Sequence, residues 1–317
     1  MQNPLTAVAL IRVGRHTAQM AVTVDRGREH TTRKRQQLVD YTLDHLALHQ
    51  SVRGVVAIGS VATGLARADS DIDAVVFMEP LDLYLAPAES IWRPRDDTYH
   101  SIFADEPDLQ TEGVQLDLHR LDLSTWRSQD HHWPEHLRSE LADGWVAFDR
   151  TGEIEELIRG RTQMSEQQRL TILDQVLVEV AGLLPQDCAL TAAALGSDEA
   201  FDRLQAAYEA LARGLFAYNY KWRPWRSRSL RSLLQLNYLP HAFRAETANA
   251  VRVRGDSTTA YNQRAVTLKE MLEMLLDRLR LDGRYGNDPV SEAFIRLHDE
   301  PGRAWNMGEW NRNRRRP

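Results

Sequence analysis

Short apolar runs separated by polar breaks fill the first half of the chain, and they predict strands. The run 54–58 suits a buried strand, and 72–78 predicts a second strand after a short helix near 61–66. In 114–121 apolar and polar residues alternate, which is typical of a strand with one buried face. We therefore expect a small mixed sheet with helices in this half of the chain.

Helical spacing and irregular stretches account for the rest of this half. Residues 31–50 have apolar positions at helical spacing, and Thr31 or Thr32 is suited to cap that helix. Residues 1–30 are compatible with short strands or pieces of helix, and the prolines within 80–113 indicate irregular chain. The run Trp145–Asp149 is compatible with an extra edge strand.

From about residue 163 the apolar positions recur at helical spacing, which predicts an all-α domain of five or six helices. A break at Arg150-Thr151-Gly152 separates the two halves, so we expect domains at 1–155 and 156–317. The expected helices are one that follows Ser165 and ends at Pro185, then Ser197–Tyr218 with Ser197 as its cap, Ser229–Leu236, one from near Pro240, and Thr258–Leu281.

Candidate chemistry lies between the first two predicted strands. Gly59 and Ser60 break the first strand, and such a turn at a helix start lets backbone N–H groups approach a phosphate. Asp71 and Asp73 open the next strand, where alternation directs them to one side. Paired carboxylates suit Mg²⁺, which proteins hold with one or two carboxylates plus substrate phosphates. Two solvated aspartates after an ordinary turn would give the same Asp-x-Asp pattern. The metal site is therefore indicated by the combination of a strand, a Gly-Ser break, a short helix and Asp-x-Asp, and not by the aspartates alone.

This stretch resembles the signature of the DNA polymerase beta-like nucleotidyltransferase superfamily. That signature is Gly-Ser, a short spacer and Asp-x-Asp, and Gly59, Ser60, Asp71 and Asp73 match it in order. The resemblance covers roughly residues 31–121. It implies an α+β nucleotidyltransferase-like domain, a small mixed sheet with helices, followed here by an all-α helical domain. The layout is similar to that of the aminoglycoside (antibiotic) nucleotidyltransferases.

The family pattern implies a third carboxylate on a later, neighbouring strand. Asp117 fits, because it shares the polar face of 114–121 with Gln115 and His119. Asp122 lies past the alternating segment and Glu112 lies before it, so both are weaker alternatives. The resemblance therefore makes Asp71, Asp73 and Asp117 the catalytic and metal-binding residues.

The helical half contains one segment rich in cations and aromatic residues, 218–228. Lys221 and Arg226 are candidates to contact a triphosphate, with Trp222 or Trp225 beside the base or substrate. A loop whose tryptophans fill the core and whose cations are solvated explains the segment equally well. Glu209 lies four residues before Arg213, and we interpret the two as an exposed ion pair on one helix.

Composition narrows the function classes. A net charge of −6 gives no general attraction to nucleic acid, and no apolar run approaches the length of a membrane span. The single cysteine, Cys188, excludes an internal disulfide, which fits a reducing cytoplasm, and no secretory signal is apparent. The basic residues 312–316 are expected to form a disordered tail. The oligomeric state stays open.

The resemblance implies transfer of a nucleoside monophosphate, with AMP from ATP as the expected case and two Mg²⁺ ions as cofactors. The acceptor is expected to be a hydroxyl of a small molecule, an aminoglycoside-type antibiotic being one candidate, and pyrophosphate leaves. Gly59 and Ser60, together with Lys221 and Arg226, would bind the phosphates of the nucleotide. The alternatives are an enzyme that modifies a protein or a tRNA in a toxin–antitoxin-type system, and an inactive fold that serves as a binding module.

Overall fold

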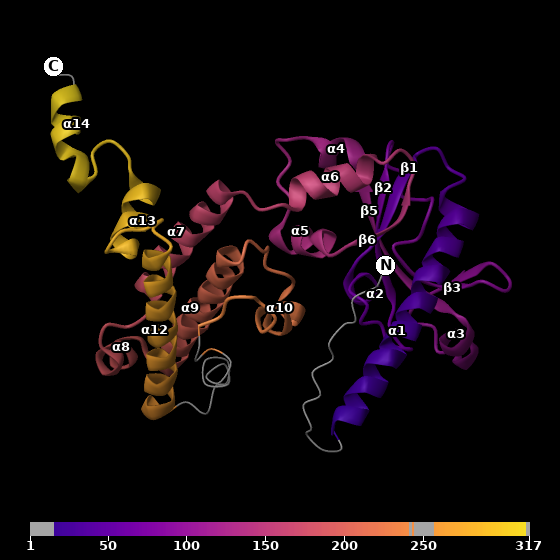
Figure 1. The fold of residues 1–317 in the computed structure, drawn as a ribbon, viewed down its shortest axis with the longest axis horizontal. Coiled ribbons are helices and arrows are strands. Elements are labelled where there is room, and N and C mark those ends of the chain that lie inside the picture. Colours follow the sequence, from indigo (N-terminus) through magenta and orange to yellow (C-terminus); the bar gives the residue numbers. More distant parts are fainter. Residues whose placement is uncertain (1–15, 241–242, 244–256, 315–317) are drawn as a thin grey trace, which may run out of the picture. The chain divides into compact units, whose positions relative to one another are not determined.

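The computed structural model describes residues 16–240, 243 and 257–314, which divide into two compact units (Figure 1). Unit 1 comprises residues 1–134 and 140–161, and unit 2 comprises 135–139 and 162–317. The boundary expected after residue 155 falls inside α6 (Glu153–Thr162), which belongs to unit 1 as far as Arg161.

Unit 1 is built on a six-stranded mixed sheet with the order β4-β3-β5-β2-β1-β6. The central strands β2 and β5 run parallel, and every other neighbouring pair is antiparallel. The strands are β1 (Val52–Ala57), β2 (Ile72–Met78), β3 (Glu89–Arg93), β4 (Thr98–His100), β5 (Val114–Asp122) and β6 (Trp145–Asp149). The expected strands at 54–58, 72–78 and 114–121 are confirmed, and 145–149 is the expected edge strand.

Helices pack against this sheet, and the first of them contacts α2 and β6. Their buried residues join those of the strands in one core that includes Leu38, Tyr41, Val55 and Val76. The helical elements of this part are α1 (His16–Tyr41), the π-helical turn η1 (Thr42–Leu46), α2 (Gly59–Ala62), α3 (Pro107–Glu112), α4 (Leu123–Arg127), α5 (Glu135–Ala142, shared between the units) and α6.

Two expectations for the N-terminal half were wrong. The first helix begins at His16, so Thr31 and Thr32 lie inside it and cap nothing. Weakly helical residues such as Gly27 fall in its first half, but helix propensity is a weak guide once a helix packs. The stretch 80–113 contains β3, β4 and α3, because pairing with β5 and between β3 and β4 supplies strand structure that local sequence does not specify.

Unit 2 is helical and has a core of its own, in which α9 contacts α7, α8, α10 and α12, and α13 contacts α7. Its helices are α7 (Glu166–Leu183), α8 (Cys188–Leu195), α9 (Ser197–Tyr218), α10 (Arg226–Leu233), α12 (Thr258–Leu281), α13 (Pro289–His298), the 3₁₀ turn η2 (Ala304–Asn306) and α14 (Met307–Asn313). The expected all-α second half is thus confirmed for the described residues.

Several details of this unit differ from the expectations. The first helix follows Ser165 as expected, and Ser165 caps it in a capping box with Gln168, whereas Gly196 and not the expected Ser197 is the N-cap of α9. The helices α8, α13 and α14 were missed, so the described residues of this unit contain more helices than the five or six expected. The third helix lies three residues earlier than expected, and the helix expected from Pro240 falls mostly outside the described residues. Arg312 belongs to α14, so the expected disordered tail is wrong there, and residues 315–317 lie outside the described part.

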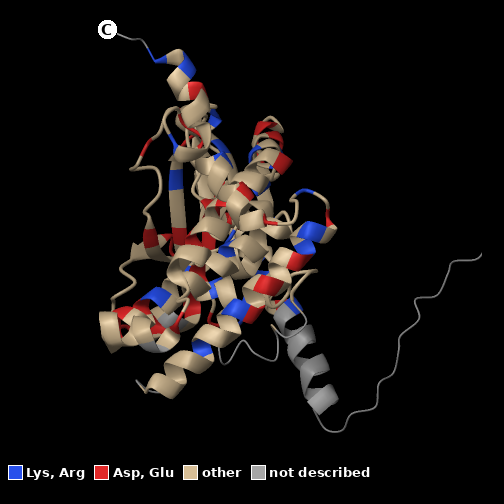
Figure 2. Cartoon of the chain, turned by 90° about the vertical axis from the view of Figure 1, so that its left-hand side faces the viewer, with Lys and Arg blue, Asp and Glu red and all other residues tan. Residues whose placement is uncertain are grey.

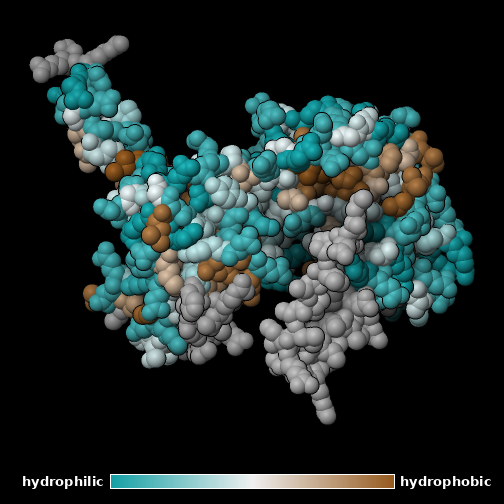
Figure 3. Space-filling model, viewed as in Figure 1, coloured by the Kyte–Doolittle hydropathy of each residue, from teal (hydrophilic) through white to brown (hydrophobic). Residues whose placement is uncertain are grey.

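None of the helices within 16–240 and 257–314 is both long and apolar enough to span a bilayer. The face seen in Figure 3 is largely hydrophilic with small hydrophobic patches. In Figure 2 acidic and basic residues are scattered over the coloured part of the ribbon, and neither kind gathers into one stripe there.

Candidate functional site

Two of the predicted carboxylates occupy matched positions on neighbouring parallel strands. The register of β2 and β5 pairs Asp73 with Asp117, and Asp71 directly precedes β2. Adjacent strands lie about 4.8 Å apart, and paired positions project to the same side of a sheet. The pairing therefore brings the Asp-x-Asp motif and the third carboxylate together, although 44 residues separate Asp73 from Asp117 in the sequence.

Burial alternates along both strands in agreement with a polar site on one face. Ile72 and Ala74 are buried, whereas Asp73 between them is half-buried. On β5 Asp117 is also half-buried, between the buried Leu116 and Leu118. The predicted apolar and polar faces of this strand are thus confirmed.

His119 adds an imidazole on the polar face of β5. Its Nε2 lies 4.0 Å from Oδ1 of Asp117, and its side chain is about half exposed. The sequence pattern predicted that this histidine would share a face with Asp117, and the contact agrees with it. The pair is an ion pair only when the imidazole is protonated.

The Gly-Ser turn joins the end of β1 to α2, next to these carboxylates. Gly59 is buried with φ of 65°, a left-handed conformation that disfavours other residues. The N–H of Ile58, just before it, donates to the carbonyl of Asp73 at 2.9 Å, which ties the turn to β2. Ser60 is half-buried within α2. The expected short helix is confirmed, but it starts at the glycine itself.

An arginine of α1 holds α2 in place. Nε of Arg35 donates to the carbonyl of Val61 at 3.1 Å, and Nη2 donates to that of Ala62 at 2.6 Å. One turn earlier, Thr31 accepts a hydrogen bond from the N–H of Ala66 through its hydroxyl. The last carbonyls of a helix need such partners, so α1 supports the motif directly.

Two charged residues near the site were missed by the sequence reasoning. Glu89 is paired with Asp117 across β3 and β5, so it extends the row of carboxylate positions to a third strand. Lys34 is buried on α1. Burial lowers the pKa of its ammonium group, and the neighbouring charge of Arg33 lowers this pKa further, whereas the charge of Asp71 raises it. The first depends on strand register and the second on helix packing, and neither leaves a signal in the sequence.

The alternative carboxylates have structural partners. Asp122 is the N-cap of α4, and its carboxylate accepts a hydrogen bond from the N–H of Thr125 at 3.0 Å. Hydrogen bonds from the hydroxyls of Ser124 and Thr125, and from the same N–H, lower the pKa of this carboxyl. Glu112 lies 3.4 Å from Arg93, at the end of α3. Neither is needed to explain the site around Asp117.

The donor set suits a hard cation, although the side chains do not form a compact cluster. Within residues 16–240, 243 and 257–314, no three His, Cys, Asp or Glu side chains are gathered closely enough to hold a metal ion. Carboxylates repel one another when no cation lies between them. Because Asp71, Asp73 and Asp117 are held at adjacent backbone positions and are half-buried, they fit Mg²⁺ by chemistry and by register.

The cationic segment of unit 2 has a mixed character. Trp222 is buried and donates from its indole to the carbonyl of Thr162 at 2.6 Å, so it belongs to the core. Lys221 is exposed, and Arg226 lies 3.3 Å from Glu209 and is largely exposed. The role of these two cations toward a nucleotide stays a proposal.

The exposed pair expected between Glu209 and Arg213 is wrong. Glu209 forms an ion pair with Arg223, while Arg213 donates to Glu135 at 2.6 Å. Tertiary contacts of both residues thus replace the local pair.

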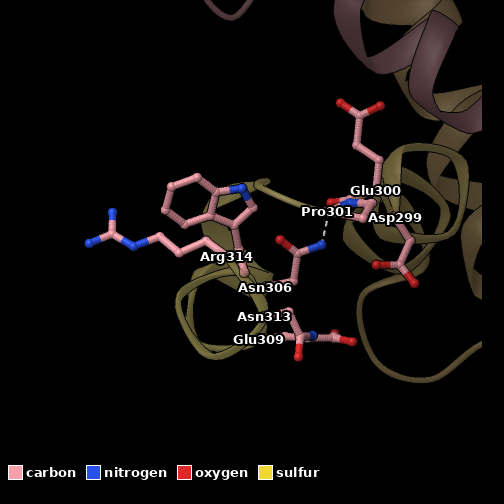
Figure 4. Close-up of a pocket in the computed structure, with 8 residues that line it drawn as sticks. Asp299, Glu300, Pro301, Asn306, Glu309, Asn313 and Arg314 are labelled. Carbon is pink, nitrogen blue, oxygen red and sulfur yellow. Dashed lines mark hydrogen bonds between the residues drawn. The ribbon is translucent and has the colours of Figure 1, made fainter. Parts of the chain in front are cut away.

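A pocket of about 460 Å³ lies at the C-terminal end of unit 2 and contains none of the predicted site residues (Figure 4). Asn306 donates a hydrogen bond to the carbonyl of Glu300 inside it. Its lining residues are Asp299, Glu300, Pro301, Asn306, Glu309, Trp310, Asn313 and Arg314.

A comparison with family models relates part of unit 1 to one family. Residues 42–119 match the family model described as a nucleotidyltransferase domain. Among solved structures, the chain is similar to a nucleotidyltransferase-like protein from Exiguobacterium sibiricum 255-15, with 12% identity and a TM-score of 0.42, over 86% of this chain and 83% of that one. No curated protein matches the chain.

Proposed function

We propose that this chain, whose residues 42–119 match a nucleotidyltransferase-domain model, transfers AMP from ATP to a hydroxyl of a small molecule. The observation that carries the proposal is the pairing of Asp73 with Asp117 on parallel strands, with Asp71 just before β2. The matched family region contains all three carboxylates and the Gly-Ser turn. An aminoglycoside-type antibiotic is the first acceptor to test.

In the proposed reaction, the acceptor oxygen forms a bond to the α-phosphorus of ATP, and the bond from that phosphorus to the oxygen leading to the β-phosphate breaks. Pyrophosphate is the leaving group, and the acceptor hydroxyl loses its proton. Asp117 accepts this proton in the proposed mechanism, since a general base must lie within hydrogen-bond reach of the attacking group. Its half-buried position leaves one side open to an acceptor.

Asp71, Asp73 and Asp117 would together hold two Mg²⁺ ions. When bound, such ions stabilise the charge on the entering and leaving oxygens of an in-line displacement. The backbone N–H groups at Gly59 and Ser60 would hold the terminal phosphates, helped by the close approach that the glycine allows. Lys221 and Arg226 would add cationic contacts to the triphosphate.

The test is pyrophosphate release by the purified protein with Mg²⁺, each NTP and a panel of aminoglycosides and small alcohols. Asp71→Asn and Asp117→Asn are expected to abolish release while leaving the melting temperature nearly unchanged. Asp69→Asn is the matched control, because this exposed aspartate lies two residues before Asp71 and pairs with Arg67 at 3.1 Å. Full activity in either of the first two variants would refute the site.

The acceptor is tested in the same experiment. Release that depends on one compound identifies it as the acceptor. If the protein binds ATP but releases pyrophosphate with none of these compounds, the small-molecule acceptor is refuted. The search then moves to protein or tRNA acceptors, for which transfer of label from α-³²P-ATP to macromolecules in a lysate gives the readout.

A further inference from the structure

One lysine occupies a position on α1 where an apolar residue is expected. The buried side of this helix contains Thr31, Lys34, Leu38 and Tyr41, at successive helical spacings. Lys34 is only 7% exposed, which is rare for lysine unless the charge has a partner. Its neighbour Arg33 is exposed on the other side of the helix.

No protein group among the described residues satisfies this ammonium. Lys34 has no hydrogen bond there and no carboxylate within 4.0 Å, although the charges of Asp71 and Asp69 act on it. By contrast, the next residue, Arg35, donates two hydrogen bonds to carbonyls of α2. The attraction to Asp71 and Asp69 is the stabilisation that the described residues give this charge, and Nζ is not among the fully buried polar atoms that lack a hydrogen bond. A lysine whose stem is buried while its charge has no direct protein partner is placed to bind an anionic ligand.

The motif itself carries a single cation, and that cation is on the surface. Between Gly59 and Asp73 the only Lys or Arg is Arg67, which is 77% exposed and paired with Asp69 at 3.1 Å. An ATP triphosphate carries several negative charges, and lysine commonly contacts phosphates as a point charge. Lys34 is a buried cation on α1, the helix that packs against α2, and the charge of Asp71 acts on it.

We propose that Lys34 is a phosphate-binding residue of the nucleotide site, which donates from its Nζ to the terminal phosphates of ATP and to the departing pyrophosphate. This assignment rests on the proposed function. It extends the site beyond the family-matched residues 42–119 to the helix that precedes them. In this arrangement α1 has two tasks, because Arg35 fixes the turn and Lys34 faces the ligand.

The test is calorimetric binding of MgATP and of Mg²⁺ with inorganic tripolyphosphate to the full chain. Lys34→Met is expected to weaken both at least about tenfold, the loss typical of a hydrogen bond to a charged group. Lys34→Arg should recover part of this loss, because it restores the charge. Arg33→Met, an exposed cation on the same helix, is the matched control and should bind like the wild type.

A structural role of Lys34 would give a different result. Removing a buried charge should leave the melting temperature of Lys34→Met unchanged or raise it, while ATP affinity falls. If Lys34→Met does not fold, Lys34→Gln provides a second neutral variant. Wild-type affinity in a folded neutral variant would overturn the proposal.

The same series separates this inference from the proposed function. Binding by the wild type that is weakened by Asp71→Asn but not by Lys34→Met would refute only the role of Lys34. If the wild type binds neither probe, or if Asp71→Asn binds both as the wild type does, the nucleotide site itself is refuted. The proposed role of Lys34 is then refuted as well.

Discussion

Replacing Arg35 by alanine tests whether α1 holds the Gly-Ser turn in place. The change removes two hydrogen bonds, of 3.1 and 2.6 Å, to the carbonyls of Val61 and Ala62. It also removes the stacking of the guanidinium, whose carbon lies 4.9 Å from the ring centre of Trp145. At about 1 kcal/mol for each hydrogen bond and about 0.5–1 kcal/mol for the cation–π contact, the free energy of unfolding should fall by about 2–3 kcal/mol.

The assay is thermal unfolding followed by circular dichroism, together with ATP binding. For a unit of this size the loss corresponds to a fall in melting temperature of about 5–10 °C. Arg35→Lys keeps the charge but not the planar fork, so it should recover less than half of the stability. Arg33→Ala, on the exposed side of α1, should change the free energy of unfolding by less than about 0.5 kcal/mol.

Two outcomes would refute this reasoning. If Arg35→Ala unfolds like the wild type, the two hydrogen bonds do not contribute measurably to stability. If it loses stability but binds ATP with unchanged affinity at a temperature where it is folded, the turn does not depend on α1 for its shape. The expected result is loss of both, because the carbonyls that Arg35 binds belong to the helix that begins at Gly59.

Three further predictions concern stability. Gly54→Ala should lower the free energy of unfolding by about 1–3 kcal/mol, because the new Cβ would lie 2.5 Å from Cγ1 of Ile154. Gly160→Ala in α6 should raise it by about 0.5–1 kcal/mol, because the new Cβ meets nothing within 4 Å. Urea unfolding measures both. Asp122→Ala should lower the free energy of unfolding by about 1 kcal/mol at pH 7, because the α4 cap is lost. Since folding lowers the pKa of this carboxyl, the difference in unfolding free energy between wild type and variant should vanish as the pH falls below about 4. Trp222→Ala should cost about 3–5 kcal/mol in thermal unfolding if the residue belongs to the core, and wild-type stability would contradict that placement.

Some elements follow from local sequence because their patterns are complete within one segment. The alternation in 114–121 predicted both β5 and its buried face, and Ser165 predicted the start of α7. The apolar spacing of 258–281 predicted α12 with both ends correct. In each case side-chain period or capping chemistry selects the structure without help from distant residues.

Other elements depend on partners far away in the sequence. The strands β3 and β4 lie in a stretch rich in proline, and β3 becomes a strand because it pairs with β5. The first half of α1 lacks a clear apolar period, so its start at His16 could not be predicted. The pair expected between Glu209 and Arg213 is replaced by tertiary partners, since helix-surface pairs are weak.

The sequence by itself determined the turn and the Asp-x-Asp motif, because the chemistry of Gly59, Ser60, Asp71 and Asp73 depends on residue type and short spacing. Only the tertiary structure decided which carboxylate lies beside Asp73. Asp117 was one of several candidates until the parallel register of β2 and β5 paired the two residues. Strand register is fixed by the burial of whole apolar faces, a property of the folded sheet that no single segment encodes. The packing of α1 likewise brought Lys34 to the motif, through contacts that exist only after folding.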